Sequence, residues 1–437
     1  MKRLFTDRPP RLTAPQLCQC EGCGLLQTAP ALAPGMTAQC VRCGVTLVSL
    51  TTHPLGHSIA LTLGAVVLLA VMCTTSLMSV QTAGIMLHAG LFSGPEELAR
   101  RGMAGLGIVV VFVTALAPSG KLIGTLYVLV RLHEARPPSH LRRVFVLVEK
   151  LRPWSMIEVF VLGVFVAYVK LGDLVHITLD TGVYALIALT IVIIWADSAL
   201  DREMIWERLG GSAGTRAGSP VAVQAGDGDS AEAIGCETCR LVSIRRAAMP
   251  YCPRCRSHLH RRKPNSLSRT WALTLAAAIL YVPANYFPVL TVMQLGAGAP
   301  STILGGVEEL LDARMYPLAA LVFFASIAVP MLKLVGLTIM LISAQAGSPA
   351  WLRDRTRLYY IVRWIGRWSM IDIFMEALLG ALVRFGSVIT IEPGIGAVAF
   401  CGVVILTMVA AETFDPRLMW DAAAARPKQA TGRVPQG

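Results

Sequence analysis

The chain has 437 residues, of which 54% are hydrophobic and only 15% are charged, and its mean hydropathy is +0.60. This composition excludes an ordinary soluble globular protein and is typical of a chain that crosses a membrane several times. The net charge of +12 does not indicate nucleic-acid binding, because the basic runs at 261–264 and 353–357 adjoin predicted spans, where such runs are common.

The first recognisable motif is a group of four cysteines near the N-terminus. It consists of two CxxC motifs separated by 16 residues, namely Cys20, Cys23, Cys40 and Cys43. In a reducing cytoplasm such pairs favour a metal site over disulfides, and two facing knuckles are typical of a zinc ribbon. Gly24 and Gly44 follow the knuckles and suit the tight turns. Cys18 offers an alternative pair with Cys20, but we interpret it as a spare or supporting thiol because it lacks the knuckle spacing.

Four apolar segments follow the first cysteine group. Each is long enough to cross a hydrocarbon core of about 30 Å, and they lie at 57–79, 103–130, 145–169 and 182–200. The first begins behind the cysteines, so we do not expect it to be a cleaved signal peptide. Between the first two spans, residues 92–102 place charges beside leucines, which predicts a short helix on the membrane face.

Two ionisable residues lie inside the spans of the first half. Lys121 comes three residues after Pro118, which predicts a kink. Glu158 comes three residues after Ser155, so the hydroxyl and the carboxylate share a helix face. A charge inside a span costs about 2.5–3.5 kcal/mol, and we therefore predict that Lys121 pairs with Glu158. Asp197 lies near the cytoplasmic end of the last span, so this half is expected to be mainly structural.

A second cysteine group opens the second half of the chain. It has the same CxxC form with 12 intervening residues, and comprises Cys236, Cys239, Cys252 and Cys255. Arg240 and Arg256 stand where the first group has glycines. His258 and His260 follow closely, but with four thiolates present we expect them to be solvated. Two structural Zn²⁺ ions are therefore predicted, one for each ribbon.

Four more spans follow the second cysteine group, at 270–295, 316–343, 359–385 and 395–413, and 302–314 matches the earlier short helix. The halves repeat at an offset of about 214 residues, most clearly in RPWSMIEVF and GRWSMIDIF, so one unit was duplicated whole. We predict an all-α polytopic membrane protein with two tandem four-helix bundles, each preceded by a small cytoplasmic zinc ribbon. The expected domains are a ribbon at 1–52, a bundle at 53–207, a flexible linker at 208–234, a ribbon at 235–262, a bundle at 263–421 and a disordered tail at 422–437.

The second half carries the richer set of polar residues within its spans. Lys333 and Asp372 occupy the positions of Lys121 and Glu158, and we predict that they pair. A buried polar network is expected from Ser326, Lys333, Ser369, Asp372 and Thr407. Glu376 lies one turn beyond Asp372 and is included in it. The counterparts in the first half are Lys121, Ser155 and Glu158. Proton relay is the functional use of such a network. The alternative is a static salt bridge that docks two helices.

Most of the 39 lysines and arginines lie on the side that holds both termini and the cysteine groups. The positive-inside rule places that side in the cytoplasm. The chain contains no GxxxxGK[ST], HExxH, GxSxG or Rossmann glycine motif, so we expect that it is not an enzyme. Thiol oxidoreduction by the CxxC pairs is a remaining alternative, which about two bound zinc ions and unreactive thiols would exclude.

The doubled ribbons, each followed by four spans with WSMI and an acid in the third, resemble the paraquat-inducible protein A family over nearly the whole chain. The resemblance implies a multi-pass protein of the bacterial inner membrane that works beside a separate periplasmic MCE tunnel protein. It also implies transport of phospholipid or another lipophile between the two membranes, and a working network of Ser326, Lys333, Ser369, Asp372 and Thr407. We hypothesise coupling to the proton gradient. The alternative is a scaffold that holds a periplasmic partner and moves nothing.

Overall fold

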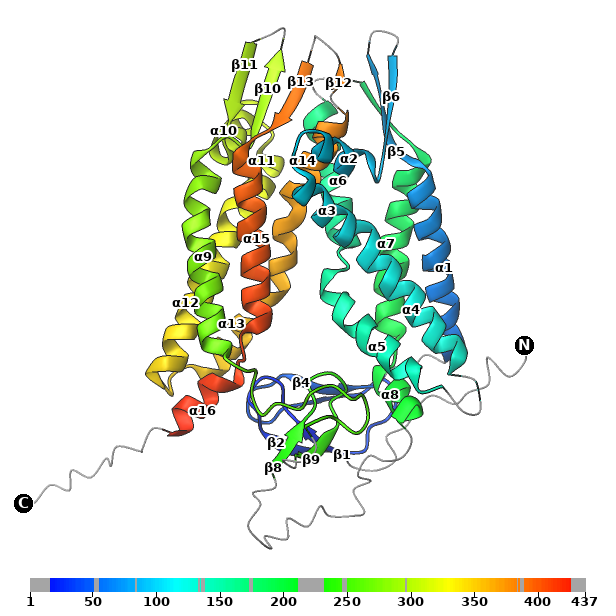
Figure 1. The fold of residues 1–437 in the computed structure, drawn as a ribbon, viewed down its shortest axis with the longest axis vertical. Helices are drawn as coiled ribbons and strands as arrows, with labels where there is room; N and C mark the ends of the chain where they lie inside the picture. Colours follow the sequence, from blue (N-terminus) through cyan, green and yellow to red (C-terminus); the bar gives the residue numbers. More distant parts are fainter. Residues whose placement is uncertain are drawn as a thin grey trace, which may run out of the picture.

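Two helical bundles lean together at one end of the molecule and separate toward the other (Figure 1). Small β-sheets cover the end where the bundles meet, and the cysteine-rich ribbons lie beneath the end where they part. We call these ends the strand side and the ribbon side. The computed structural model describes residues 16–50, 55–82, 85–132, 134, 138–172, 176–210, 232–245, 250–294, 297–382, 384–385 and 389–425.

The first bundle contains eight α-helices, two of them joined through a π segment and two through a 3-10 turn. They are α1 (Leu55–Thr74), α2 (Ser93–Arg100), α3 (Ala104–Val111), η2 (Phe112–Leu116, π), α4 (Ala117–Arg131), α5 (His140–Leu151), η3 (Arg152–Trp154, 3-10), α6 (Ile157–Gly172), α7 (Thr181–Ala199) and α8 (Arg202–Gly210). The π segment precedes Pro118, whose missing N–H breaks the regular hydrogen-bond ladder. The sequence predicts a kink at Pro118, and the structure has a π segment just before this residue.

The second bundle repeats this order. Its elements are α9 (Ser266–Tyr286), α10 (Ile303–Asp312), α11 (Tyr316–Phe323), η4 (Phe324–Ala328, π), α12 (Val329–Ala346), α13 (Leu352–Ile365), η5 (Gly366–Met370, 3-10), α14 (Ile371–Leu382), α15 (Ile395–Thr413) and α16 (Arg417–Ala425). Helices α9 and α15 run side by side. A Cβ on Gly402 would lie 2.3 Å from the Leu280 side chain, so this close crossing depends on glycine.

Seven helical segments in the described part of the chain are long and apolar enough to cross a membrane. They are Leu55–Thr74, Ala104–Arg131, His140–Val169, Thr181–Ala199, Ser266–Tyr286, Tyr316–Ala346 and Ile395–Thr413. The eighth predicted span, 359–385, is not among them. It corresponds to α13, η5 and α14, and even its most apolar part contains three charged residues, Arg367, Asp372 and Glu376. This segment is the counterpart of α5, η3 and α6 in the first half.

The strand-side sheets were not predicted from the sequence. One sheet has the order β6-β5-β7, from β5 (Ser76–Thr82), β6 (Ile85–Gly90) and β7 (His176–Leu179). The other has the order β11-β10-β13-β12, from β10 (Leu290–Gln294), β11 (Ala297–Ser301), β12 (Arg384–Phe385) and β13 (Ile389–Pro393). All pairings are antiparallel. The predicted span at 270–295 was too long, because α9 ends at Tyr286 and β10 begins at Leu290.

The two predicted short helices are present as α2 and α10. Helix α2 of the first half packs against α14 of the second half, and a Cβ on Gly94 would lie 2.6 Å from the Ala377 carbonyl oxygen. Helix α10 begins at Thr302, whose Oγ1 accepts a hydrogen bond of 3.2 Å from the Gly305 N–H. Helix α2 is therefore partly enclosed between the bundles.

Helices α6 and α14 form the main contact between the two bundles. The rings of Phe160 and Phe374 meet edge to face, with centroids 5.4 Å apart. These residues end the matching nonapeptides of the two halves, so the contact joins equivalent positions of the repeat. Gly163 allows the approach, since a Cβ there would lie 2.8 Å from the Phe374 Cβ.

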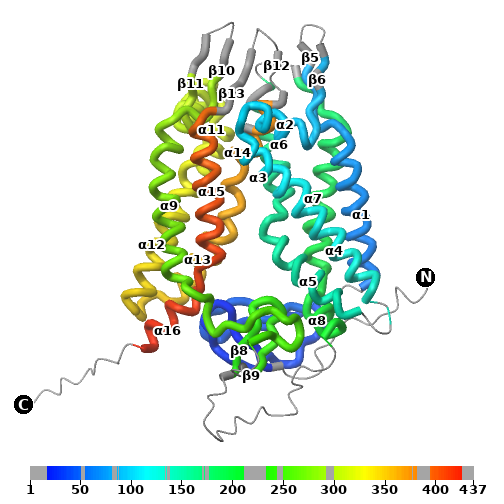
Figure 2. The backbone as a smooth tube through the Cα atoms, viewed as in Figure 1, coloured from blue at the N-terminus to red at the C-terminus, as the bar shows by residue number. Residues whose placement is uncertain are grey.

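The two ribbons lie side by side beneath the bundles (Figure 2). The first contains β1 (Gln16–Gln19), β2 (Leu26–Ala29), β3 (Thr37–Gln39) and β4 (Thr46–Ser49), and the second contains β8 (Glu232–Gly235) and β9 (Val242–Arg245). The Gln19 side-chain oxygen accepts a 2.7 Å hydrogen bond from the Gly235 N–H, which joins the ribbons directly. Most of the predicted linker and of the predicted tail lies outside the described residues.

Each ribbon packs beneath the bundle of the other half. The first ribbon shares an apolar cluster with Trp420 of α16, and the Arg42 guanidinium lies 4.3 Å from the centroid of that ring. The second ribbon shares a cluster with Trp206 of α8 and with α4 and α5 of the first bundle. Trp206 and Trp420 are equivalent in the repeat. The ribbons are therefore exchanged between the halves.

Candidate functional site

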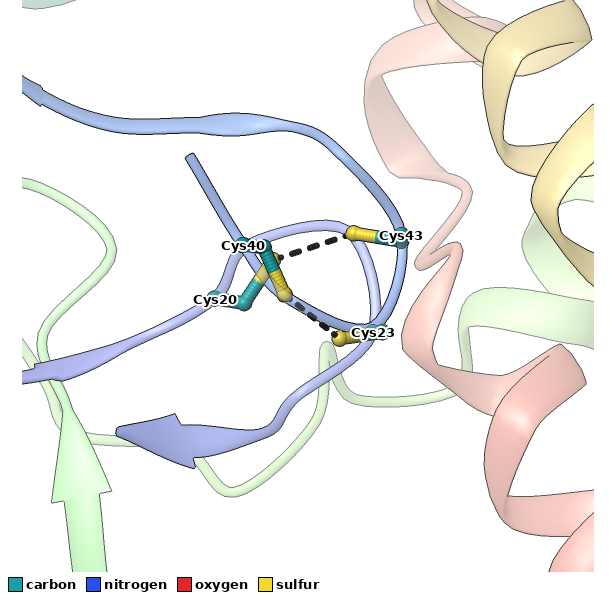
Figure 3. A group of neighbouring side chains, drawn as sticks. All are labelled: Cys20, Cys23, Cys40 and Cys43. Atoms are coloured by element: carbon teal, nitrogen blue, oxygen red, sulfur yellow. Dashed lines mark hydrogen bonds between the residues drawn. The ribbon is translucent and has the colours of Figure 1, made fainter. Parts of the chain in front are cut away.

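The first cysteine group forms a compact cluster of four buried thiols (Figure 3). The Sγ atoms of Cys20 and Cys43 are 3.4 Å apart, and those of Cys23 and Cys40 are 3.5 Å apart. The Gly24 and Gly44 N–H groups close the two knuckles by bonding the Cys20 and Cys40 carbonyls, each at 2.9 Å. Both glycines have a positive φ, as the knuckle turn requires.

The second group has the same geometry. Its Sγ pairs, Cys236 with Cys255 and Cys239 with Cys252, are each 3.5 Å apart. Arg240 takes the left-handed conformation that glycine adopts in the first ribbon, with φ of 59°, and Arg256 does the same with φ of 61°. The knuckle geometry is thus retained at positions where a side chain disfavours it.

Both clusters fit a tetrahedral zinc ion. Zn–S bonds of about 2.3 Å place the sulfurs of a tetrahedral site about 3.8 Å apart, and all four ligand atoms in each group lie within 4.8 Å of one another. Hydrogen bonding with Cys23 lowers the pKa of Cys20 to about 5, and the same contact raises the pKa of Cys23. Each group supplies four protein ligands, so zinc bound there would be structural. Cys18 lies in β1 outside the first group, and His258 and His260 stack on each other outside the second.

The second bundle encloses several polar side chains between its helices. The Lys333 Nζ in α12 donates a hydrogen bond of 3.3 Å to the Thr407 Oγ1 in α15. Lys333 is 1% exposed and Asp372 in α14 is 5% exposed. An ideal Cβ on Gly366 of η5 would lie 4.0 Å from the Lys333 Nζ, so the ammonium group also lies beside the 3-10 turn. The predicted pairing of Lys333 with Asp372 stays a prediction.

The two serines of the predicted network have different environments. Ser326 lies in the π segment η4 and donates a 2.7 Å hydrogen bond to the Val322 carbonyl of its own helix. Its counterpart Thr114 in η2 does the same with Val110, so this hydroxyl serves the backbone in both halves. Ser369 in η5 is fully buried, and its Oγ has no hydrogen-bond partner among the described residues. The Glu376 side chain lies outside the described part of the chain.

The first half pairs its charges differently from the sequence prediction. The Lys121 Nζ contacts the Asp197 Oδ2 of α7 at 2.7 Å, and Glu158 accepts a hydrogen bond of 3.1 Å from Arg367 of the other half. The predicted Lys121–Glu158 pair is therefore wrong. Helical spacing does not say which neighbouring helix Glu158 faces, and Ser155 lies in the extended break before α6 rather than in the helix. Ser155 is buried between η3 and α6.

The second half lacks this arrangement. Ala411 occupies the position of Asp197, and the first half has Ile193 where the second has Thr407. Lys333 therefore has a neutral hydroxyl neighbour where Lys121 has a carboxylate. An alignment of the two halves shows this difference, because Ala411 stands where the first half has Asp197.

The paraquat-inducible protein A family model matches residues 55–210 and 267–424, which are the two bundles. The chain belongs to the paraquat-inducible protein A family. Intermembrane transport protein PqiA of Escherichia coli is 35% identical over 407 residues, which cover 92% of this chain and 95% of that protein. Lipophilic envelope-spanning tunnel protein A of the same species is 30% identical, with 92% and 91% covered.

A probable intermembrane transport protein of Haemophilus influenzae is 26% identical, with 94% of this chain and 97% of that protein covered. No solved structure matches the chain. The apolar helices identify the chain as a multi-pass membrane protein. Its relatives support an intermembrane transport role.

Proposed function

We propose that the chain transports phospholipid or another lipophile between the inner and outer membranes of a bacterium, together with a separate MCE-family tunnel protein. The ribbons would lie in the cytoplasm and the sheets in the periplasm, because basic residues are concentrated on the ribbon side. Two relatives are named intermembrane transport proteins, and a third is named an envelope-spanning tunnel protein. These names support both the role and a tunnel-forming partner.

The observation that carries this proposal is the buried contact between Lys333 and Thr407. Desolvation of an ammonium group is costly, and such groups within membrane helices mark transport pathways more often than sites of static packing. The two residues come from α12 and α15, and Asp372 is buried on α14, so a proton gained or lost here would alter the contacts of three helices. We infer that this change drives the second bundle between two shapes.

The experiment uses the full chain and its MCE partner in donor vesicles with an imposed proton gradient. Transfer of a fluorescent phospholipid to acceptor vesicles is measured for the wild type and for Asp372→Asn. We expect a loss of about 10-fold or more, since the group can no longer ionise, with normal insertion and unfolding temperature. Asp354→Asn is the matched control, because Asp354 is exposed on α13. Retained transfer in Asp372→Asn, or transfer indifferent to a protonophore, would contradict proton coupling.

A scaffold role is the second candidate. It is favoured by the sheets on the strand side, because the backbone edge of an outer strand such as β11 can pair with a partner strand. A scaffold tolerates Lys333→Met and Asp372→Asn but loses its partner when α2 or α10 is altered. Co-purification of the partner and lipid transfer, measured on the same variants, separate the two functions.

A further inference from the structure

A large cavity lies between the two bundles at the ribbon side. Its volume is about 1000 Å³, and the two ribbons form its floor. Its walls come from η3 and the ends of α7 and α8 in the first half, and from α13 and α15 in the second. The bundles are widely separated at this level (Figure 1). The cavity is distinct from the Lys333–Thr407 contact, since neither residue lines it.

Charged residues of both signs line this cavity. Each of its six carboxylates has a basic partner among the described residues. The pairs are Glu21–Arg240, Glu149–Arg202, Asp197–Lys121, Glu203–Arg254, Glu237–Arg417 and Glu412–Arg363. The negative charge of the walls is therefore balanced.

Two further cations in the wall are not balanced in this way. Lys150 at the end of α5 and Arg152 in η3 both line the cavity, and neither forms a direct ion pair among the described residues. The Glu149 carboxylate, next to Lys150 in the chain, lies 3.7 Å from Arg202 and also interacts electrostatically with Arg152. The lining as a whole contains six carboxylates and five cations, so the positive charge of Lys150 and Arg152 is local to one wall, where it favours the anionic group of a ligand.

The same cavity has apolar walls beside these cations. Trp154 and Pro153 continue the wall that carries Arg152, and Leu200, Trp206 and Met408 line other parts of it. A ligand that fits must have an anionic group and an apolar body. A guanidinium group binds a phosphate through two parallel hydrogen bonds, and a lysine adds a point charge.

We propose that this cavity binds the phosphodiester head group of an anionic glycerophospholipid from the ribbon-side face of the membrane. Lys150 and Arg152 contact the phosphate, and Trp154 lies against the glycerol and the upper acyl chains. The inference rests on the proposed function, because it names the place where the transported lipid is taken up or delivered. A free phosphate shares the anionic chemistry but not the apolar contact.

The test uses the full chain in nanodiscs of phosphatidylethanolamine and phosphatidylglycerol. A photoactivatable phosphatidylglycerol is crosslinked, and the labelled peptides are identified by mass spectrometry. We expect labelling at residues 150–154 and 200–206, reduced about 10-fold in Lys150→Ala/Arg152→Ala because charge-assisted hydrogen bonds are lost. Arg143→Ala/Arg269→Ala removes the same charge from exposed positions outside the cavity and should label like the wild type.

The outcomes are distinct. Equal labelling of the wild type and Lys150→Ala/Arg152→Ala, or labelling confined to outward-facing helix surfaces, would overturn the proposal. Full competition by millimolar inorganic phosphate would assign the cavity to a free anion and would also overturn it. If the cavity is labelled as expected while the wild type transfers no lipid, this site stands and the transport proposal fails. If Lys150→Ala/Arg152→Ala still transfers lipid and is labelled like the wild type, the transport proposal stands and this binding site fails.

Discussion

Arg367 of the second half forms an ion pair with Glu158 of the first half, with 3.1 Å between the Nη1 and Oε1 atoms. The pair has no symmetric counterpart, because Pro153 occupies the position of Arg367 in the first half. Asp372, the counterpart of Glu158, is far more deeply buried. The pair connects α6 with η5 and also distinguishes the two halves chemically.

The Arg367–Glu158 pair should add little to stability. Both side chains are about one-third exposed, and pairs of this kind contribute about 0–1 kcal/mol. In a double-mutant cycle with Arg367→Ala and Glu158→Gln, thermal unfolding in detergent should give a coupling free energy within that range. A coupling of several kcal/mol would mean that the pair is desolvated within the membrane and holds the bundles together.

Removing the acceptor of the Lys333 hydrogen bond should destabilise the second bundle. Thr407→Val retains the side-chain volume but leaves a buried ammonium donor without this partner, at a cost of about 1–3 kcal/mol. Lys333→Met/Thr407→Val removes both polar groups and should recover most of that stability. The free energy of unfolding and lipid transfer are measured together. We expect the double variant to be stable and inactive, and activity in it would contradict a role for Lys333.

Zinc loss from one ribbon should alter the bundle of the other half. Cys43→Ser leaves three thiolates in the first ribbon, and we expect about one bound zinc ion instead of two per chain. Limited proteolysis should then cleave around α13 and α16, where the first ribbon packs on Trp420. Cys252→Ser should instead expose α8 and its Trp206. Cleavage confined to each ribbon's own half would show that the exchanged contacts are not formed in solution.

The packing of α2 on α14 should not tolerate a methyl group. Gly94→Ala would place its Cβ 2.6 Å from the Ala377 carbonyl oxygen, and overpacking of this kind costs about 1–3 kcal/mol. Gly64→Ala is the matched control on α1, because nothing lies within 4 Å of its added Cβ. The control should be neutral or slightly stabilising, since alanine favours a helix by about 0.8–1 kcal/mol over glycine. Unfolding temperatures of the two variants decide the comparison.

Features that depend on local spacing were predicted well from the sequence. The CxxC knuckles identified all eight thiols of the two groups, and the repeat identified the equivalence of Lys121 and Lys333. The short helices α2 and α10 were also expected. Each of these features is set within a few residues, where turn geometry and helical periodicity are sufficient.

Features that depend on packing between distant segments were not predicted. Lys121 could have faced Glu158 or Asp197, and helical periodicity does not choose between neighbouring helices. Strand β7 pairs with β5 across about a hundred residues of chain, and short strands beside long apolar helices have a weak sequence signal. The cavity around Lys150 and Arg152 likewise exists only because two bundles and two ribbons enclose it.

The exchange of ribbons makes each half depend on the other to bury its apolar surface. A chain with only one ribbon and one bundle would expose the apolar surface around Trp206 or Trp420, with no second unit to cover it. The two halves are therefore repeats in sequence but not separable folding units, and a cut between them would leave each half with an uncovered tryptophan.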